Sequence, residues 1–430
     1  MYTSRAAEIL TVGDELTRGE IVDTNAAWLA ERLTLLGLHV RWHSSTTDDA
    51  GDLREAFRLA AARADVVVCS GGLGPTEDDR TVDVASELLG VAPAIDEAHR
   101  EKMRARFEER GFALTPNNLR QVRIPSGSEP LPNRAGLAPG FRARMIMNGH
   151  AAELFAMPGV PREMRRIFEE EVEPRLRARL AGEGAAPVAV AKRVWRAAGI
   201  GESHVDHRLR GLLDGIEGAT LHFRIAFPEN LVTVVVRRAT AAEAEAVLDR
   251  LDGEVRARLG EHVYATGDET LPAAIGARLR ALGATLATAE SCTGGLIGDL
   301  LTDVPGSSDY YRGGVVAYAN AIKERLLGVR PETLAASGAV SEPCVREMAE
   351  GARRAIGADW AIAVSGIAGP GGGSDEKPVG LVHFAVAGPR GTEARRLLWP
   401  GERRMVKQLA AHAALFFLYK ELARATGGPA

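Results

Sequence analysis

The sequence has few cysteines, no excess of basic residues and no long apolar run. Its 430 residues include three cysteines, and 53 Lys and Arg against 57 Asp and Glu give a formal net charge of −4. The spacing of Cys69, Cys292 and Cys344 excludes a disulfide framework and a cysteine-rich zinc site, and it favours a reducing compartment. The charge excludes a global basic field for nucleic acid or an anionic membrane. We expect a cytoplasmic protein, because no apolar stretch approaches the roughly 20 residues that cross a bilayer and no leader precedes the first predicted strand.

The length and the order of the apolar patterns predict three domains. The chain is too long for one ordinary core. Strand and helix patterns alternate over residues 1–170 and again over 263–430, which is typical of α/β sandwiches. Residues 171–262 predict a smaller α+β domain. The predicted fold is therefore α/β, with two sandwich domains joined by the small one.

Two local patterns add detail to this fold. Asn148-Gly149 lies between two apolar runs and predicts a hairpin. A closing helix is predicted from about Glu402 to Ala425. Its apolar residues recur at helical spacing and should face a sheet; they are Val406, Leu409, Ala410, Ala413 and Phe417.

The segment AESCTGG, residues 289–295, follows a predicted strand and precedes a predicted helix. Ser291 would then lie at the carboxyl edge of the sheet, with helix N–H groups behind it to hold an oxyanion or a phosphate. A serine needs a base, and Lys323 follows a predicted buried strand and could serve if burial leaves its amine neutral. Cys292 is the rival nucleophile. The same residues also fit a tight turn with a helix cap, and the spacing leaves both interpretations open.

A glycine-rich run, GIAGPGGGSDEKPVG, lies between two apolar strands at residues 366–380. It is not a phosphate-binding P-loop, because no GK[ST] follows. One interpretation is a mobile loop that offers backbone donors over a pocket, and the other is a long disordered hairpin.

Four segments together resemble the CinA C-terminal family, the nicotinamide mononucleotide (NMN) amidohydrolases, in order and spacing over residues 265–425: AESCTGG, VPGSSDYYRGGVVAYANAIKERLLGV, SGAVSEP and SGIAGPGGGSDEKPVG. The resemblance implies that Ser291 is the nucleophile and Lys323 its base. It also implies hydrolysis of NMN to nicotinic acid mononucleotide and ammonia, without a metal or cofactor. Further site residues implied are Ser308 and Tyr318 as catalytic assistants, and Thr293, Gly294, Gly295, Gly369 and Arg403 in substrate binding. Arg403, in GER where the family has GDR, would hold the phosphate.

The N-terminal segments VGDELTRGEIVDTN and SGGLGPTEDDRT gather carboxylates and glycines at predicted strand ends. The carboxylates could hold a divalent cation such as Mg²⁺, and the backbone of Gly71, Gly72 and Gly74 could cradle phosphates. Alternatively, the acidic residues are solvated caps.

These N-terminal segments, together with NNLRQVRIP, PNRAGLAPGF and MPGVPREM, resemble the CinA N-terminal domain over residues 1–170. That resemblance implies a molybdopterin-binding fold and a metal-dependent ADP-ribose pyrophosphatase, with Asp23, Asp78 and Asp79 at the metal. The middle segment resembles the KH-like domain of long CinA proteins, but it has no GXXG loop, so nucleic acid is not expected as a partner. The family architecture implies a homodimer.

Three hypotheses follow from the resemblance. In the first, the chain is a bifunctional enzyme of pyridine nucleotide salvage that acts on NMN and ADP-ribose. In the second, it is a binding protein for a cofactor or nucleic acid, linked to competence or DNA damage. In the third, the amidase alone is active and the N-terminal domain is a non-catalytic binding module.

Overall fold

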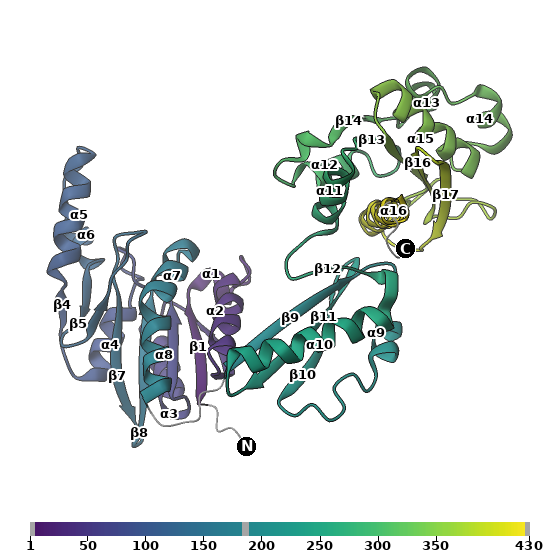
Figure 1. Ribbon diagram of the computed structural model, residues 1–430. Helices are drawn as coiled ribbons and strands as arrows, with labels where there is room; N and C mark the ends of the chain where they lie inside the picture. The colour runs from purple at the N-terminus through teal and green to yellow at the C-terminus, as the bar shows by residue number, and fades with distance from the viewer. Residues whose placement is uncertain (1–4, 183–188, 426–430) are drawn as a thin grey trace. The chain divides into compact units, whose positions relative to one another are not determined.

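The computed structural model describes residues 5–182 and 189–425, and the chain divides into two compact units (Figure 1). One unit comprises residues 1–191 with 236–246, and the other comprises 192–235 with 247–430. Among the described residues, no helix combines the length and the apolar character needed to cross a membrane.

The first unit is built on a six-stranded sheet of order β2-β1-β3-β8-β7-β6. Strands β1, β2, β3 and β8 are parallel, while β7 runs antiparallel to β8 and β6. A separate antiparallel pair joins β4 to β5. The strands are β1 Ala6–Val12, β2 His39–Thr46, β3 Val66–Ser70, β4 Pro93–Ile95, β5 Arg123–Pro125, β6 Glu129–Leu131, β7 Gly140–Met147 and β8 His150–Met157. The helices are α1 Asp14–Thr17, α2 Thr24–Leu35, α3 Ala50–Arg63, α4 Thr81–Leu89, α5 Glu97–Glu109, α6 Pro116–Arg120, α7 Pro161–Ile167 and α8 Glu173–Gly182.

Alternate residues of the parallel strands enter two different cores, one on each face of this sheet. Leu10 of β1 packs in a core with α3 and α4, whereas Ile9 packs with α2, α7 and α8. This period-two division is expected for a strand covered on both faces. The predicted α/β sandwich is confirmed, and so is the hairpin at Asn148, which has a φ of 52° between the antiparallel strands β7 and β8.

The predicted end of the first domain, residue 170, lies inside a continuous helical segment and is corrected here. A π-helical turn, Phe168–Val172, connects α7 to α8. Val172 and Leu176 are fully buried in the core that α2 shares with the sheet. Burial of these apolar side chains ties the helix to the first domain as far as Gly182.

The middle segment forms a four-stranded sheet of order β10-β11-β9-β12. Its elements are β9 Ala189–Ala197, α9 Glu202–Leu209, β10 Ala219–Ala226, β11 Glu229–Arg238, α10 Ala241–Leu259 and β12 Val263–Thr266, with a 3-10 turn at Gly260–His262. Strand β12 pairs antiparallel with β9. The predicted boundary after residue 262 is therefore also corrected, because backbone pairing places Val263–Thr266 in the middle sheet.

The C-terminal sheet has the order β14-β13-β15-β16-β17. Strands β14, β13 and β15 are parallel, and β16 and β17 complete the sheet antiparallel. The strands are β13 Leu286–Glu290, β14 Tyr311–Val316, β15 Trp360–Gly366, β16 Leu381–Gly388 and β17 Gly391–Leu398. The helices are α11 Leu271–Leu282, α12 Leu296–Thr302, α13 Asn320–Leu327, α14 Pro331–Ser337, α15 Glu342–Ile356 and α16 Arg403–Ala425, with a 3-10 turn at Ser307–Asp309.

Side-chain size differs between the two faces of this sheet. Ile362 and Val364 of β15 pack toward α11 and α16, while Ala361 and Ala363 face α15. Small side chains let α15 approach the sheet closely. At Gly351 of α15 a Cβ would lie 1.8 Å from the carbonyl oxygen of Leu327, so α15 also packs closely against the end of α13. Figure 1 shows α15 and α16 on opposite sides of β16 and β17. The sheet is therefore covered on both faces, and its carboxyl edge remains for a site.

Candidate functional site

Three adjacent parallel strands end together at the carboxyl edge of the C-terminal sheet. Glu290 of β13 pairs with Val316 of β14 on one side and with Val364 of β15 on the other. The next residues along each strand must then meet at this edge, and Ser291 continues the ladder by donating its amide to the Val364 carbonyl at 2.9 Å. The strand register therefore places Ser291 beside the segment that leads from β14 into α13.

Lys323 lies on the first turn of α13 and reaches back to Ser291. Its Nζ is 3.1 Å from Ser291 Oγ, 2.7 Å from the Ala317 carbonyl oxygen and 3.2 Å from the Tyr318 carbonyl oxygen. Ser291 is 8% exposed and Lys323 is 1% exposed. A buried lysine thus has two carbonyl acceptors and one hydroxyl as neighbours.

This arrangement suits a neutral amine. Burial lowers the pKa of Lys323 from its ordinary value, because desolvation penalises the charged form. A neutral amine has two N–H donors and one lone pair. The carbonyls of Ala317 and Tyr318 can accept both donors, and the lone pair then faces the Ser291 hydroxyl. The geometry is that of a nucleophile hydrogen-bonded to its base.

Cys292 is poorly placed to be the nucleophile. Burial raises the pKa of its thiol to about 12, so the thiol stays protonated near neutral pH. Cys69 and Cys344 are buried as well. Lys323 is hydrogen-bonded to the Ser291 hydroxyl, and this favours Ser291 over Cys292 as the nucleophile.

The buried carboxylate of Glu290 occupies helix donors that the sequence interpretation had assigned to a ligand. It accepts the backbone N–H groups of Gly295 at 3.0 Å, Ile297 at 3.1 Å and Gly298 at 2.9 Å. These are amides at the start of α12, where a negative charge also complements the helix dipole. The expectation that the N-terminus of α12 holds an oxyanion or phosphate is therefore wrong for these three amides.

We expect Glu290→Gln to loosen the start of α12. An amide group keeps one acceptor and turns an N–H group toward the helix donors, so about 2 kcal/mol of local stability should be lost. Hydrogen exchange of the Gly295, Ile297 and Gly298 amides should accelerate roughly 30-fold, since 1.4 kcal/mol corresponds to a factor of ten. The control is Asp299→Asn, which alters an exposed carboxylate on the first turn of the same helix. Equal exchange in the two variants would contradict the capping role.

Tyr318, Gly369 and Arg403 are brought together at the mouth of the site. Arg403, at the start of α16, donates from Nη1 to the Gly369 carbonyl at 2.7 Å and from Nη2 to the Tyr318 hydroxyl at 3.1 Å. Tyr318 is 62% exposed. The arginine therefore connects the base of the glycine-rich loop to the segment that carries Lys323.

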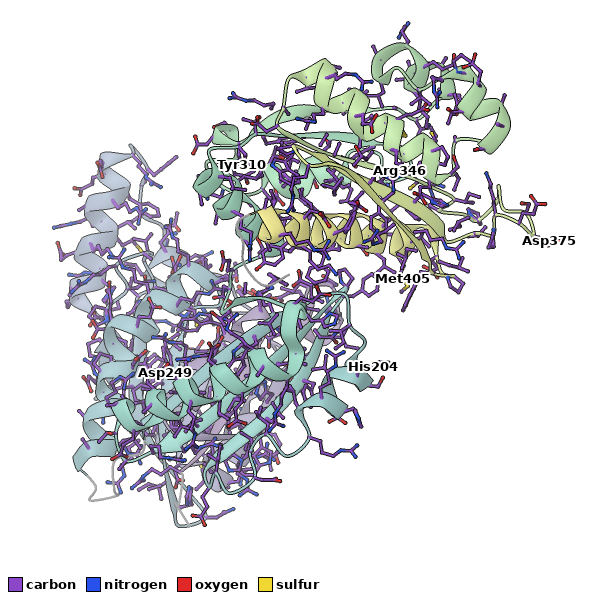
Figure 2. All side chains as sticks on the ribbon, turned by 45° about the vertical axis from the view of Figure 1, so that its right-hand side comes forward. His204, Asp249, Tyr310, Arg346, Asp375 and Met405 are labelled. Atoms are coloured by element: carbon purple, nitrogen blue, oxygen red, sulfur yellow. The ribbon has the colours of Figure 1, made fainter. Side chains whose placement is uncertain are left out.

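The glycine-rich loop contributes its base to the site. Gly366 and Ala368 line the cavity, whereas residues 371–376 are exposed. Asp375 lies at the tip of the loop, which projects away from the sheet in Figure 2. The base of the loop therefore lies beside the cavity, and its tip lies away from it.

Ser308 does not line this cavity in the single chain, and its catalytic role stays a prediction. It is exposed on the 3-10 turn before β14, whereas Tyr318 follows the other end of that strand. The six residues of β14 separate the two ends by about 20 Å at 3.3 Å per residue.

Thr293 is fully buried under the turn that follows Ser291, and Gly294 and Gly295 form this turn with φ values of 65° and 99°.

Ser291 and Lys323 line a cavity of about 210 Å³. Its lining consists of Ser291, Cys292, Tyr318, Asn320, Lys323, Ala339, Val340, Ser365, Gly366, Ala368 and Arg403. The sequence interpretation gave no role to Asn320, Val340 and Ser365, although all three lie in or beside the segments that carry the resemblance. The signal that could have found Ser365 is its place at the end of β15, next to β13.

The N-terminal glycines are used mainly within their own domain. The amide of Gly71 donates to the Met157 carbonyl, and the amide of Gly74 donates to Asp79 Oδ1 at 2.7 Å. A Cβ at Gly72 would lie 2.3 Å from Thr81 Oγ1. Two of the three amides of the predicted phosphate cradle, those of Gly71 and Gly74, therefore already have acceptors, and phosphate binding there stays a prediction.

The predicted metal residues Asp23, Asp78 and Asp79 are not gathered into one site. Asp23 caps α2 by accepting the Ala26 amide at 2.8 Å. Asp79 accepts the amides of Gly74 and Thr76 and the Thr76 hydroxyl, and Asp78 is exposed. Within residues 5–182 and 189–425, no group of three His, Cys, Asp or Glu side chains could hold a metal ion. In this structure Asp23 and Asp79 act as helix and turn caps, and their role at a metal, like that of Asp78, stays a prediction.

A different carboxylate, Asp48, was missed in this region. Asp48 Oδ2 accepts the Asp14 amide at 3.0 Å, and Asp14 Oδ1 accepts the Asp48 amide at 3.2 Å. Burial raises the pKa of the Asp48 carboxyl, and the charges of Asp14, Glu15 and Asp78 add to this effect. Asp14 and Asp48 therefore bind each other's backbone amides, and Asp78 of the predicted trio is one of the charges that act on Asp48.

Comparison with known proteins identifies each part of the chain. Three family models match: the CinA C-terminal domain over residues 268–422, the probable molybdopterin binding domain over 8–178, and the damage-inducible protein CinA KH domain over 192–265. A CinA-like protein from Anaeromyxobacter sp. (strain Fw109-5) is 46% identical over 413 residues, which cover 96% of this chain and 98% of that protein. A CinA-like protein from Geobacter sulfurreducens is 42% identical over 416 residues, with coverage of 96% and 98%.

A solved structure is similar to part of the chain. The competence damage-inducible protein A from Klebsiella pneumoniae is 44% identical, covers 36% of this chain and 95% of its own, and gives a TM-score of 0.35. The full-length relatives carry the assignment, because they match nearly the whole sequence. The chain belongs to the CinA family, with molybdopterin-binding-like, KH and CinA C-terminal domains in that order.

Proposed function

We propose that the C-terminal domain is an amidohydrolase that converts NMN and water to nicotinic acid mononucleotide and ammonia. One observation carries the proposal: Lys323 Nζ lies 3.1 Å from Ser291 Oγ while two backbone carbonyls are available to both N–H bonds of a neutral amine. A lysine with only a structural role would not need a hydroxyl group facing its lone pair, as Ser291 Oγ does here. The family resemblance supplies the substrate.

The first half of the reaction forms an acyl-enzyme. Lys323 removes the proton from the Ser291 hydroxyl, and Oγ bonds to the carboxamide carbon of the nicotinamide ring. The resulting lysine ammonium then donates its proton to the nitrogen of the tetrahedral intermediate. The C–N bond breaks, ammonia leaves, and the nicotinoyl group remains as an ester of Ser291.

The second half of the reaction hydrolyses the acyl-enzyme and regenerates the free enzyme. Lys323, neutral again, accepts a proton from a water molecule whose oxygen attacks the ester carbon. The ester C–O bond breaks, Oγ recovers the proton from the lysine, and nicotinic acid mononucleotide is released. These steps need only the side chains of Ser291 and Lys323. Arg403 and Tyr318, hydrogen-bonded to each other at the cavity mouth, hold the segment that carries Lys323 beside the glycine-rich loop.

Ammonia release from NMN by the full chain, without added metal, tests this proposal. We expect turnover that chelator does not abolish. Failure to release ammonia from NMN would contradict the proposal and would direct attention to the N-terminal domain.

The ADP-ribose pyrophosphatase activity stays a prediction and is not part of the proposal. The three carboxylates predicted for its divalent cation do not fit a common metal site, as described above, so no reaction step is derived through a metal. Release of AMP from ADP-ribose with and without Mg²⁺ distinguishes a bifunctional enzyme from one whose N-terminal domain only binds a ligand. The homodimer likewise stays a prediction.

A further inference from the structure

Lys407 has no assigned role, yet its ammonium group lies over the turn that follows Ser291. It sits on α16 one turn after Arg403, so the two cations share a helix face. Met405, labelled in Figure 2, lies between them in the sequence. A Cβ built on Gly294 would lie 3.7 Å from Lys407 Nζ. The ammonium group therefore faces the Gly294 backbone directly.

The backbone of the turn at Gly294 is open on the side that faces this ammonium group. Apart from Gly294 and its chain neighbours, Lys407 Nζ is the only atom of the described chain within 4 Å of that Cβ position. In the described residues 5–182 and 189–425, no acceptor or carboxylate pairs with Lys407. The charge also reaches the interior of the site, since Lys407 acts to lower the pKa of the buried Cys292 thiol against the larger effect of burial.

Arg403 differs from Lys407 in this respect. Its two terminal nitrogens already donate to the Gly369 carbonyl and the Tyr318 hydroxyl. These contacts connect the glycine-rich loop to the segment that carries Lys323, which is a positioning role. Of these two cations on one helix face, Arg403 is hydrogen-bonded within the protein, whereas Lys407 has no such partner among the described residues.

We infer that Lys407 binds the terminal phosphate of the mononucleotide substrate, beside the Gly294-Gly295 turn. This inference rests on the proposed function and adds a binding residue to that site. A phosphate brings two negative charges and several acceptor oxygens, and a compact ammonium with free donors matches them. The absence of a side chain at Gly294 leaves room for the phosphate to approach the ammonium group.

The test compares NMN with nicotinamide riboside, which has the same reacting carboxamide and no phosphate. We expect Lys407→Met to raise the KM for NMN about tenfold or more, because a charge-assisted contact is lost. The kcat for NMN and the kcat/KM for nicotinamide riboside should change little. Lys407→Arg should restore part of the affinity for NMN. The control is Arg404→Met, which removes a neighbouring exposed cation from the same helix.

An unchanged KM for NMN in Lys407→Met, or an equal loss for both substrates, would overturn the inference. Failure of the proposed function appears separately, as absence of turnover by the wild type with either substrate. In that event, calorimetry with ribose 5-phosphate measures whether Lys407 binds a phosphate. At least tenfold weaker binding by Lys407→Met than by Arg404→Met supports the phosphate site, and equal binding overturns it.

Discussion

Replacing Ser291 by alanine is expected to lower the kcat/KM for NMN by about 10⁴-fold or more, the scale of loss when a catalytic nucleophile is removed. In the proposed mechanism the acyl-enzyme forms on Oγ, and no other hydroxyl is hydrogen-bonded to Lys323 in the described structure. The measurement is ammonia release at saturating and limiting NMN. The KM or the product affinity should change much less than kcat.

The matched control for this prediction is the adjacent Cys292→Ala. The Cys292 thiol is buried and its pKa is raised to about 12, so its removal should leave most of the activity. If Cys292→Ala were as inactive as Ser291→Ala while both variants still bound product, the assignment of Ser291 as the nucleophile and of Cys292 as a non-catalytic neighbour would have to be revised. If Ser291→Ala stayed as fast as the wild type, the acyl-enzyme mechanism would be wrong.

Replacing Lys323 by methionine is expected to lower kcat by roughly 10²–10⁴-fold, the range for a lost general base. Methionine has a similar length and fills the same buried space without a basic nitrogen. Lys323→Arg should not restore activity, because a guanidinium stays protonated and cannot accept the Ser291 proton. Activity in the arginine variant close to that of the wild type would exclude Lys323 as the base.

The pH dependence gives an independent measure of the same lysine. Lys323 must be neutral to act, and burial lowers its pKa below the ordinary value of 10.5. The kcat/KM for NMN should therefore rise with pH and reach a plateau after a midpoint below 10.5. A profile that falls with rising pH over this range would contradict a neutral lysine base.

Much of the fold followed from local patterns in the sequence. Alternating strand and helix patterns predicted both sandwich domains, and Asn148-Gly149 predicted a hairpin that is present. The domain ends were less predictable. The helix that runs to Gly182 and the strand β12 belong to their domains through buried side chains and backbone pairing, which local patterns do not show.

The predicted face of α16 was also only partly right. Val406, Ala410 and Phe417 are buried in the core, as their spacing indicated, but Leu409 and Ala413 are only partly buried. Both line a separate cavity with Trp399 and Phe416. Helical spacing gives the direction of a side chain from its own helix, but it does not say what lies opposite.

The sequence by itself determined the residue types and the order of the motifs: a serine after a strand, a lysine after the neighbouring strand, and glycines where the backbone turns. Only the tertiary structure decided which of them meet. Parallel register brings Ser291 and Lys323 within 3.1 Å, whereas it leaves Ser308 at the opposite end of β14. The tertiary structure also fixes the charge state of each group and whether the group is free to bind a ligand, because the residues that bury it, accept its hydrogen bonds or are capped by it are distant in the chain. For this reason Glu290, Asp79 and Lys407 could be assigned roles only once their neighbours in space were known.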